Sequence, residues 1–370
     1  MDELITTVVP TYRRPQLLRR AVVSALSQSY GQLKVCVFDN ASGDETEEVV
    51  ASLIRQDARV SYIKNERNVG AVANMMRGAA SVSTGFYSFL NDDDFLLPNF
   101  YQNAMNGIRK SPRVGFVCAK TVTVDIPNRK LQLRNSEWQP RIYEPSISTM
   151  SKMYRSHFTQ TGVLFRQEMR QLIGLYEKSG NDILYMTMAA ATASFLVLDS
   201  CGGAFTIHPQ SYTSTGGISQ ERLVYLYEAL ISTLSSVIKM NLADDMKVHL
   251  LSLISNYYYG MFELKRLAEL KAENDSGSAS SEPLPSRVTF AGVLCKLHER
   301  FPRKRHALLA KALDWLTTRS RRAAIQTNLA GWSNFPNDAH IEMITVGSSN
   351  LEFAQFLQQF EQQVSKLSGA

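Results

Sequence analysis

The chain has 370 residues, of which 44% are hydrophobic and 20% charged, and it carries a formal net charge of +6. This composition is that of a globular protein, which excludes a fibrous or largely disordered chain. The length exceeds the roughly 250 to 300 residues at which a single core stops growing, so we expect two domains. The positive charge favours an anionic partner, but it does not distinguish a nucleotide sugar from nucleic acid or acidic lipid.

The amino terminus and the cysteines favour a cytoplasmic protein. Acids stand among the first residues where an export signal would carry basic residues, and no run reaches the roughly 18 apolar residues of a membrane span. The cysteines, Cys36, Cys118, Cys201 and Cys295, lie far apart and form no Cys-x-x-Cys pair. This spacing predicts neither a zinc site nor a disulfide framework.

Strands and helices alternate along the first ninety residues. β-Branched residues predict a strand over Ile5–Val9 that stops at Pro10, and Pro15 is well placed to open a helix. The next predicted elements are strands over Lys34–Phe38 and Arg59–Ile63, a helix over Val69–Ala80 and a strand over Phe86–Leu90. This alternation predicts a parallel sheet covered by helices, with ligands bound beyond the carboxyl ends of its strands.

Helical sequence predominates beyond Ser219. Leucines and a valine recur there at three-to-four spacing, at Leu223, Leu226, Leu230, Leu234 and Val237. The segment Glu273–Pro285 is Ser-rich and contains prolines, which predicts a linker or mobile loop. A last helix is predicted over Leu351–Leu367.

Three consecutive carboxylates follow the predicted strand that ends near Leu90. They are Asp92, Asp93 and Asp94, in the segment FLNDDDFLLP. Carboxylates in this number repel one another unless a cation lies among them, and hard oxygen ligands suit Mg²⁺ or Mn²⁺. The alternative is an acidic helix start, with these residues capping a helix near Leu97.

Asp39 ends another predicted strand. A carboxylate in this place can accept the ring N–H of a nucleotide base. The alternative is a turn in which the Asp39 side chain bonds its own backbone, because Ser42 and Gly43 follow closely.

Four segments in order carry a resemblance to a known family: VVPTYRRP, VFDNASGDET, NVGAVANMMRGA and FLNDDDFLLP. Together they resemble the landmarks of the large inverting glycosyltransferase family two, and TGVLFRQEMRQLIGLYEKSGND and AFTIHPQSYTS are similar to its acceptor-side and closing segments. The resemblance implies a GT-A fold, a Rossmann-like mixed α/β sheet flanked by helices. We expect it over residues 1–218, with nucleotide-sugar binding in 1–100 and the acceptor side in 101–218, followed by a mainly α-helical domain over 219–370 with a linker or mobile loop near 273–287.

The resemblance also implies site residues. The expected nucleotide-sugar contacts are Pro10, Thr11, Tyr12, Asp39, Arg67, Asn68, Gly70, Asp92 and Asp93. Asp39 matches the acid that recognises uracil, which makes UDP the expected nucleotide. Asp92, Asp93 and Asp94 cover the DxD-type site, so that Asp94, Asp92 and His208 are the expected ligands of Mn²⁺ or Mg²⁺. The alternative for His208 is an ordinary core or surface histidine.

The resemblance places the catalytic base at Asp182, which follows Asn181 and the Gly174-Leu175-Tyr176 segment. A helix start at Asp182 is compatible with this role. The sequence departs from the family pattern at two positions: Arg13 stands where asparagine is frequent, and Asn91 where an aspartate is frequent. Without a QxxRW-like segment, a single-sugar transferase is favoured over a processive synthase.

The expected activity is metal-dependent, inverting transfer of one sugar from a UDP-sugar to a glycan or lipid-linked acceptor, as in polysaccharide biosynthesis. The alternatives are a non-catalytic scaffold of the same fold and a sugar nucleotidyltransferase, although VVPTYRRP lacks the glycine-rich phosphate loop of the latter. No motif accompanies the basic charge that would indicate nucleic-acid binding. The basic amphipathic segment Lys296–Arg322 predicts either peripheral docking to an acidic inner membrane face or packing in the helical domain, where homo-oligomer contacts are also expected.

Overall fold

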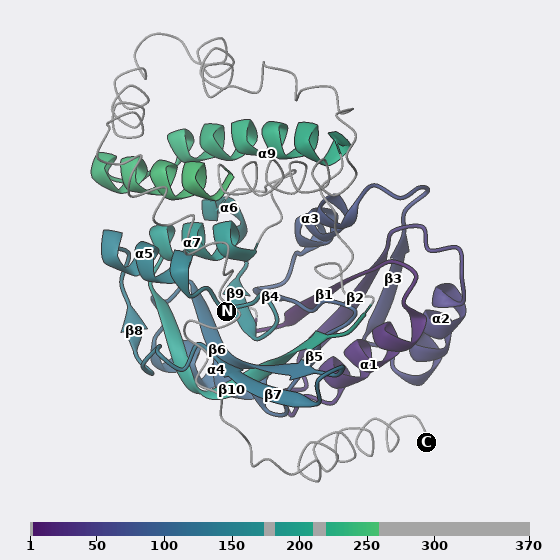
Figure 1. Cartoon of the computed structure of the whole chain (residues 1–370). Helices are drawn as coiled ribbons and strands as arrows, with labels where there is room; N and C mark the ends of the chain where they lie inside the picture. Colours follow the sequence, from purple (N-terminus) through teal and green to yellow (C-terminus); the bar gives the residue numbers. More distant parts are fainter. Residues whose placement is uncertain (1–2, 174–181, 210–219, 259–370) are drawn as a thin grey trace. The chain divides into compact units, whose positions relative to one another are not determined.

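The structure of the chain is a computed structural model, and it describes residues 3–173, 182–209 and 220–258. The described residues fall into two compact units, one of residues 3–173 with 182–209 and one of residues 220–258 (Figure 1). All strands of the described residues belong to the first unit.

A mixed sheet forms the centre of the first unit, in the order β3-β2-β1-β4-β9-β6-β10-β5, with β7 paired to β6 and β8 to β10. The strands are β1 (Ile5–Thr11), β2 (Leu33–Asp39), β3 (Val60–Lys64), β4 (Phe86–Phe89), β5 (Phe95–Leu96), β6 (Phe116–Asp125), β7 (Lys130–Arg134), β8 (Ile142–Tyr143), β9 (Val163–Arg166) and β10 (Phe195–Ile207). The first four strands are parallel, whereas β9 runs antiparallel to both β4 and β6. This is the mixed GT-A sheet that the sequence predicts.

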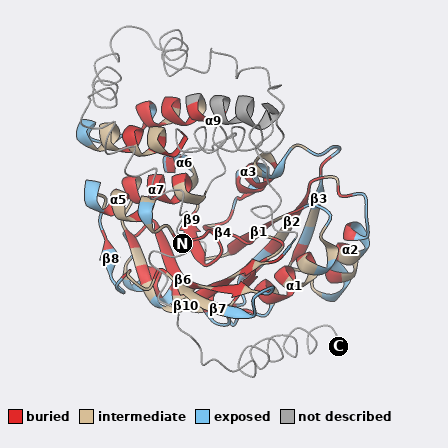
Figure 2. Cartoon of the chain, viewed as in Figure 1, coloured by how far each residue is buried: buried red, intermediate tan, exposed pale blue. Residues whose placement is uncertain are grey.

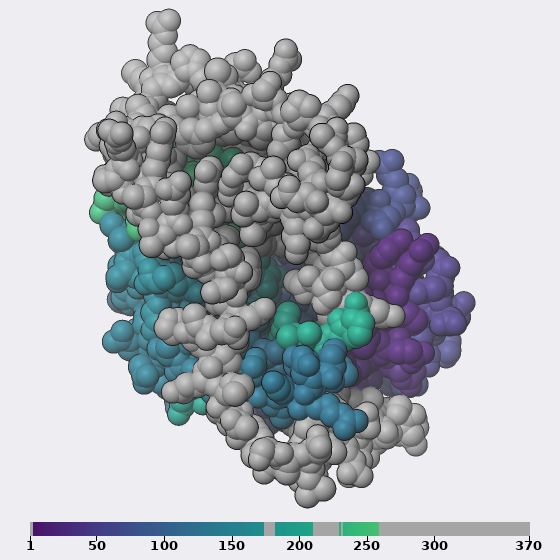
Figure 3. All heavy atoms as spheres, viewed as in Figure 1, coloured from purple at the N-terminus to yellow at the C-terminus, as the bar shows by residue number. Residues whose placement is uncertain are grey.

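Helices cover both faces of the sheet. α1 (Pro15–Leu26), α2 (Thr46–Gln56) and α4 (Phe100–Lys110) pack on one face and bury a common apolar core, whereas α3 (Ala71–Ser81) lies on the other face (Figures 1 and 2). The later residues of this unit add α5 (Ile147–Arg155), α6 (Met169–Ile173) and α7 (Asp182–Thr192). In the space-filling view, residues 3–100 in purple to blue adjoin the later residues of this unit in blue to teal (Figure 3).

Two local features differ from or extend the sequence prediction. β1 continues to Thr11 rather than stopping at Pro10. Pro10 is tolerated because β1 pairs with β4 only as far as Val8, so the missing N–H of proline breaks no bond on that side.

Gly78 brings α3 close to β1, since a Cβ at this position would lie 2.4 Å from Cγ1 of Val8.

The acidic run does not begin a helix. β5 follows Asp94 directly, and α4 begins only at Phe100, with Asn99 as its N-cap residue. The alternative interpretation of Asp92–Asp94 as helix-capping acids is therefore wrong.

The second unit is helical where it is described. α9 (Gln220–Lys239) matches the leucine periodicity, with Leu230, Leu234 and Val237 buried, and residues 244–258 form a further helical segment. The linker near 273–287, the basic segment and the predicted last helix lie outside the described residues. Among the helices of the described ranges, none is long and apolar enough to cross a bilayer.

Candidate functional site

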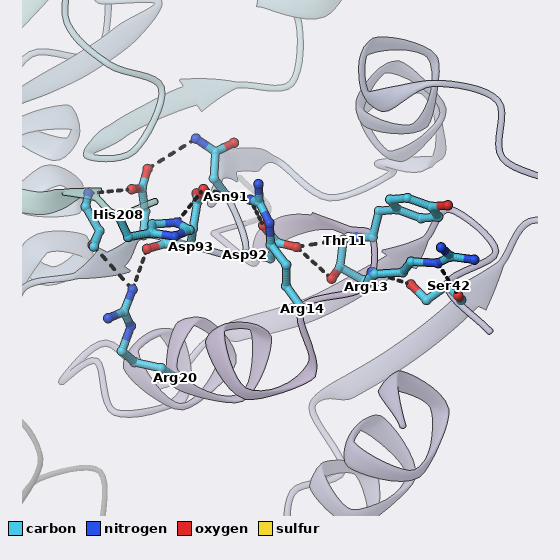
Figure 4. Close-up of polar contacts among 12 residues, drawn as sticks. Thr11, Arg13, Arg14, Arg20, Ser42, Asn91, Asp92, Asp93 and His208 are labelled. Carbon is cyan, nitrogen blue, oxygen red and sulfur yellow. Dashed lines mark hydrogen bonds and ion pairs between the residues drawn. The ribbon is translucent and has the colours of Figure 1, made fainter. Parts of the chain in front are cut away.

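The polar clusters that end β1, β2 and β4 lie together at one edge of the sheet, as the sequence predicts (Figure 4). Thr11 Oγ1 donates a hydrogen bond to Asp92 Oδ2 over 2.8 Å, and the Tyr12 backbone N–H reaches the same oxygen over 3.3 Å. The Asn40 backbone N–H bonds the Thr11 carbonyl over 3.0 Å. The parallel pairing of the strands therefore brings the loop after β1 into contact with both the acidic run and the Asp39 loop.

Two positively charged side chains and a histidine surround the acidic run. Nη1 of Arg14 bridges two carboxylates, lying 3.1 Å from Asp92 Oδ1 and 2.7 Å from Asp93 Oδ2. His208 Nε2 lies 3.3 Å from Asp93 Oδ2, and Nη2 of Arg20 donates to the Asp93 backbone carbonyl. His208 thus lies in the candidate site, where it contacts Asp93. No sequence pattern indicates a role for Arg14 or Arg20, although Arg14 stands in the VVPTYRRP segment.

Asp94 is fully buried and accepts hydrogen bonds from three directions. Thr161 Oγ1 and Asn91 Nδ2 donate to its Oδ2 over 2.7 and 3.1 Å, and the Thr206 backbone N–H donates to its Oδ1 over 2.9 Å. Asn91, which departs from the family pattern, therefore supplies a donor where an aspartate would add another negative charge. Asp94 therefore connects the segment after β4 with the segment before β9 and with β10.

Burial sets the protonation behaviour of these acids. It raises the pKa of Asp92 to about 6, even though the neighbouring Arg14 charge acts in the opposite direction. It raises the pKa of Asp94 to about 7, and the adjacent Asp93 charge adds to this increase. A raised pKa means that the surroundings stabilise the ionised carboxylate poorly. A cation bound beside these acids would stabilise the ionised form, as in a site that also binds an anionic ligand.

Asp39 is almost completely buried at the end of β2. Its Oδ1 accepts from the backbone N–H of Ser42 over 3.0 Å and from the Ser42 hydroxyl, and its Oδ2 accepts from the Tyr62 hydroxyl over 2.6 Å. The alternative interpretation of a local turn is therefore confirmed. A carboxylate has about four acceptor positions, so these three bonds leave room for one further donor.

Arg13 and Tyr12 flank this loop. The Arg13 backbone has φ 55°, a left-handed conformation that asparagine adopts more readily than arginine. The loop holds it by bonds from its backbone N–H to Ser42 Oγ and from Nε to the Ser42 carbonyl. Its guanidinium lies 5.2 Å from the Tyr12 ring centre, and Tyr12 is 37% exposed, so this ring is accessible to a planar ligand.

An asparagine network positions the next loop. Asn68 Oδ1 accepts from Asn40 Nδ2 and from the Gly70 backbone N–H, each over 2.8 Å. Gly70 has φ 90°, a conformation that favours glycine, and it precedes α3. Arg67 is exposed on the same loop. The structure therefore brings Asn68 and Gly70 beside the Asp39 loop.

Asp182 begins α7, which agrees with the predicted helix start; residues 174–181 before it lie outside the described part. Burial raises the pKa of Asp182 to about 6, while a hydrogen bond from the Gln160 backbone and the Arg134 charge act to lower it. The Arg134 guanidinium interacts electrostatically with both Asp182 and Asp94. These two acids therefore share one neighbour, although they lie on different elements.

The acidic run and His208 have the ligand chemistry that Mg²⁺ or Mn²⁺ requires. Within the described residues, no three histidine, cysteine, aspartate or glutamate side chains are grouped around one position. Mg²⁺ is commonly held by one or two carboxylates together with substrate phosphates, so a complete protein cage is not required. Asp93 Oδ2 and His208 Nε2 lie 3.3 Å apart, close enough for one ion to bind both.

Comparisons with known proteins place part of the chain in a family. The family described as glycosyl transferase family 2 matches residues 6–173. A GalNAc(5)-diNAcBac-PP-undecaprenol beta-1,3-glucosyltransferase of Campylobacter jejuni is 36% identical over 94 residues, which are 25% of this chain and 30% of that protein. A chondroitin synthase of Escherichia coli is 29% identical over 157 residues, 42% of this chain and 22% of that protein. The chain thus spans less than half the length of these relatives.

Among solved structures, that of S. aureus TarS 1–349 in complex with UDP-GlcNAc is similar, with a TM-score of 0.56 and 18% identity. The match covers 82% of this chain and 83% of that one. At this identity the likeness concerns the fold.

Proposed function

Since residues 6–173 belong to glycosyl transferase family 2, we propose that the chain transfers one sugar from a UDP-sugar, with inversion, to a hydroxyl of a glycan or lipid-linked acceptor. The observation that carries the proposal is the meeting of the Asp39 loop, the acidic run and His208 at one edge of the sheet. Two relatives support the acceptor class, because their names denote enzymes that act on a lipid-linked oligosaccharide and synthesise a polysaccharide.

Three loops hold the nucleotide: the loop after β1, the Asp39 loop and the loop that precedes α3. Asp39 has one acceptor position left for the ring N–H of uracil, and the accessible Tyr12 ring offers a stacking surface. Pro10 and Thr11 shape this loop, while Asn68, Gly70 and the exposed Arg67 lie along the nucleotide. UDP is the proposed nucleotide because a carboxylate favours a ring that donates a hydrogen bond.

The acidic run and His208 would hold Mn²⁺ or Mg²⁺ together with the diphosphate. Such an ion stabilises the negative charge that grows on the departing diphosphate. Arg14 balances Asp92 and Asp93 with its own charge, so an ion that binds Asp93 competes with this ion pair. Asp94 and Asp92 remain the ligands that the sequence predicts, with Asp93 placed nearest to His208.

Asp182 acts on the acceptor. Its carboxylate accepts the hydroxyl proton while the acceptor oxygen bonds the anomeric carbon and the sugar–phosphate bond breaks, with the electron pair passing to UDP. The pKa of about 6 keeps Asp182 ionised, yet basic enough to take a proton, near neutral pH. Inversion follows from displacement in one step from the opposite face of the sugar.

UDP is expected to stabilise the protein against thermal unfolding only when Mn²⁺ or Mg²⁺ is present. The reason is that the acidic run repels the diphosphate unless an ion lies between them. Mass action predicts a gain of about 2.7 kcal/mol in the free energy of unfolding at a hundredfold excess over the dissociation constant. Thermal unfolding is measured with UDP, Mn²⁺ and a chelator in all combinations, and equal stabilisation by UDP with and without chelator contradicts the metal requirement.

A further inference from the structure

Two polar side chains on the acceptor side have buried atoms that lack partners. Both carboxylate oxygens of Glu137 and the Nε2 of Gln160 are buried, and none of these atoms has a hydrogen-bond partner within the described part of the chain. Leaving such groups unpaired is unfavourable, and nearly all of them in native proteins bond protein, water or ligand. Both residues are therefore candidates for binding a polar ligand.

The backbone around Glu137 is held firmly. Its carbonyl accepts from Lys152 Nζ over 3.0 Å, and the next residue, Trp138, is fully buried and donates from Nε1 to the Ser156 carbonyl over 2.8 Å. Lys152 Nζ also lies 4.2 Å from the Trp138 ring centre. Trp138 is a core residue rather than a stacking surface, and it fixes the place from which the Glu137 side chain starts.

Gln160 lies in a short segment that joins the two halves of the proposed site. Thr161 Oγ1 bonds Asp94, while the Gln160 backbone donates to Asp182. Thr159 Oγ1 lies 3.0 Å from Thr121 Oγ1 on β6 and anchors the segment to the sheet. The unpaired amide of Gln160 is therefore next in the chain to a residue that contacts Asp94, and its own backbone contacts the proposed base.

Arg134 connects Glu137 to the same place. It ends β7, and its guanidinium lies 5.4 Å from the Phe205 ring centre on β10. It interacts electrostatically with Asp182, Asp94 and Glu137. The single positive charge of Arg134 does not balance three carboxylates. A negatively charged ligand group is therefore disfavoured beside Glu137.

On the basis of the proposed transferase function, we infer that Glu137 and Gln160 bind hydroxyl groups of the acceptor beside Asp182. A hydroxyl donates to the Glu137 carboxylate, and a hydroxyl or ring oxygen accepts from the Gln160 amide. A neutral, hydroxyl-rich unit such as a sugar or polyol offers both functions at once. The acceptor unit that enters the site is therefore neutral at the point of contact.

The test uses the full chain with Mn²⁺ and UDP-N-acetylglucosamine, and it follows UDP release with N-acetylglucosamine, N-acetylgalactosamine, glucose or ribitol as acceptor probes. At least one probe is expected to accelerate UDP release. In Glu137→Gln and Gln160→Leu, the KM for that probe rises by about 10-fold to 100-fold, as for a lost hydrogen bond to a charged or buried group, while the UDP dissociation constant is unchanged. Glu144→Gln, an exposed glutamate on the following segment, is the control and leaves both values unchanged.

Thermal unfolding provides a second measurement. The change in the unfolding midpoint has opposite signs for a ligand-binding glutamate and for a purely structural one. Glu137→Gln removes a buried carboxylate that makes no hydrogen bond and adds to the excess of negative charge around Arg134, so the midpoint of unfolding without acceptor is expected to rise, whereas a structural glutamate would give a fall. The inference is overturned by an unchanged probe KM, by a fall in the midpoint, or by the absence of acceleration with every probe while UDP still binds. Failure of the proposed function is recognised separately, because the unmodified chain with Mn²⁺ would then release no UDP from any UDP-sugar, with or without a probe.

Discussion

Replacing Asp182 with asparagine is expected to abolish sugar transfer while the affinity for UDP-sugar stays close to that of the unmodified protein. The amide is isosteric with the carboxylate and can still accept the hydrogen bond from the Gln160 backbone, so the start of α7 is preserved. It cannot accept the acceptor proton, however, and loss of a general base lowers turnover by about 10²-fold to 10⁴-fold. Steady-state turnover and UDP binding are measured on the same preparation.

The pH dependence of turnover provides the control for this assignment. Asp182 must be ionised to act as a base, and its pKa is raised to about 6, so the rate falls as the pH decreases through that value. The buried acids Asp92 and Asp94, with pKa values of about 6 and 7, contribute to the same limb until a cation lowers them. Retention of more than about a tenth of turnover in Asp182→Asn would place the base elsewhere.

The second large effect is expected for Asp94→Asn, which should weaken both donor affinity in the presence of Mn²⁺ and turnover. Asp94 is the last and fully buried carboxylate of the acidic run, and removing its charge would weaken the binding of a cation that stabilises the diphosphate. By analogy with the loss of one preorganised electrostatic contact, turnover falls by about 10²-fold to 10³-fold. Isothermal titration of UDP with and without Mn²⁺ measures the affinity.

Folding of the Asp94→Asn variant can be checked independently. The new amide can keep its oxygen toward the Thr206 backbone N–H. Its Nδ2 can then donate to the Thr161 hydroxyl after that hydroxyl rotates, and to Asn91 after the Asn91 amide turns over to present its oxygen. An unfolding midpoint near that of the unmodified protein therefore separates lost ion binding from lost structure. Full Mn²⁺-dependent affinity for UDP in this variant would show that Asp94 does not hold the ion.

The amino-terminal half of the fold could be predicted because its signals are local. β-Branched runs, Pro15 and the turn at Asp39 specify strands, a helix start and a loop from neighbouring residues alone. Strand alternation then places the carboxyl ends together, which explains why Thr11, Asp39 and the acidic run were expected at one edge. The antiparallel β9 and the two-residue β5 carry no comparable pattern, since long-range pairing rather than local sequence defines them.

The residues that contact the motif residues of the site were less predictable than the motif residues themselves. Arg14, which precedes α1, bridges Asp92 and Asp93, and Arg20 on α1 reaches the Asp93 carbonyl, because α1 packs beside β5 and β1. Glu137 and Gln160 show no motif at all, and they become notable only because folding buries their polar atoms without partners. Such residues are recognised from three-dimensional packing, which neither spacing nor charge along the chain encodes.

The most direct test of the proposed transfer is proton NMR of the sugar first released from UDP-α-N-acetylglucosamine by the full chain with Mn²⁺. Inverting transfer to water or to an added saccharide predicts UDP together with a sugar in the β configuration before mutarotation. Release of UMP with a sugar 1-phosphate would instead indicate nucleotidyl chemistry, and a first product in the α configuration would exclude inversion. Either of these results, or the absence of any donor cleavage with this and other UDP-sugars, would contradict the proposed function.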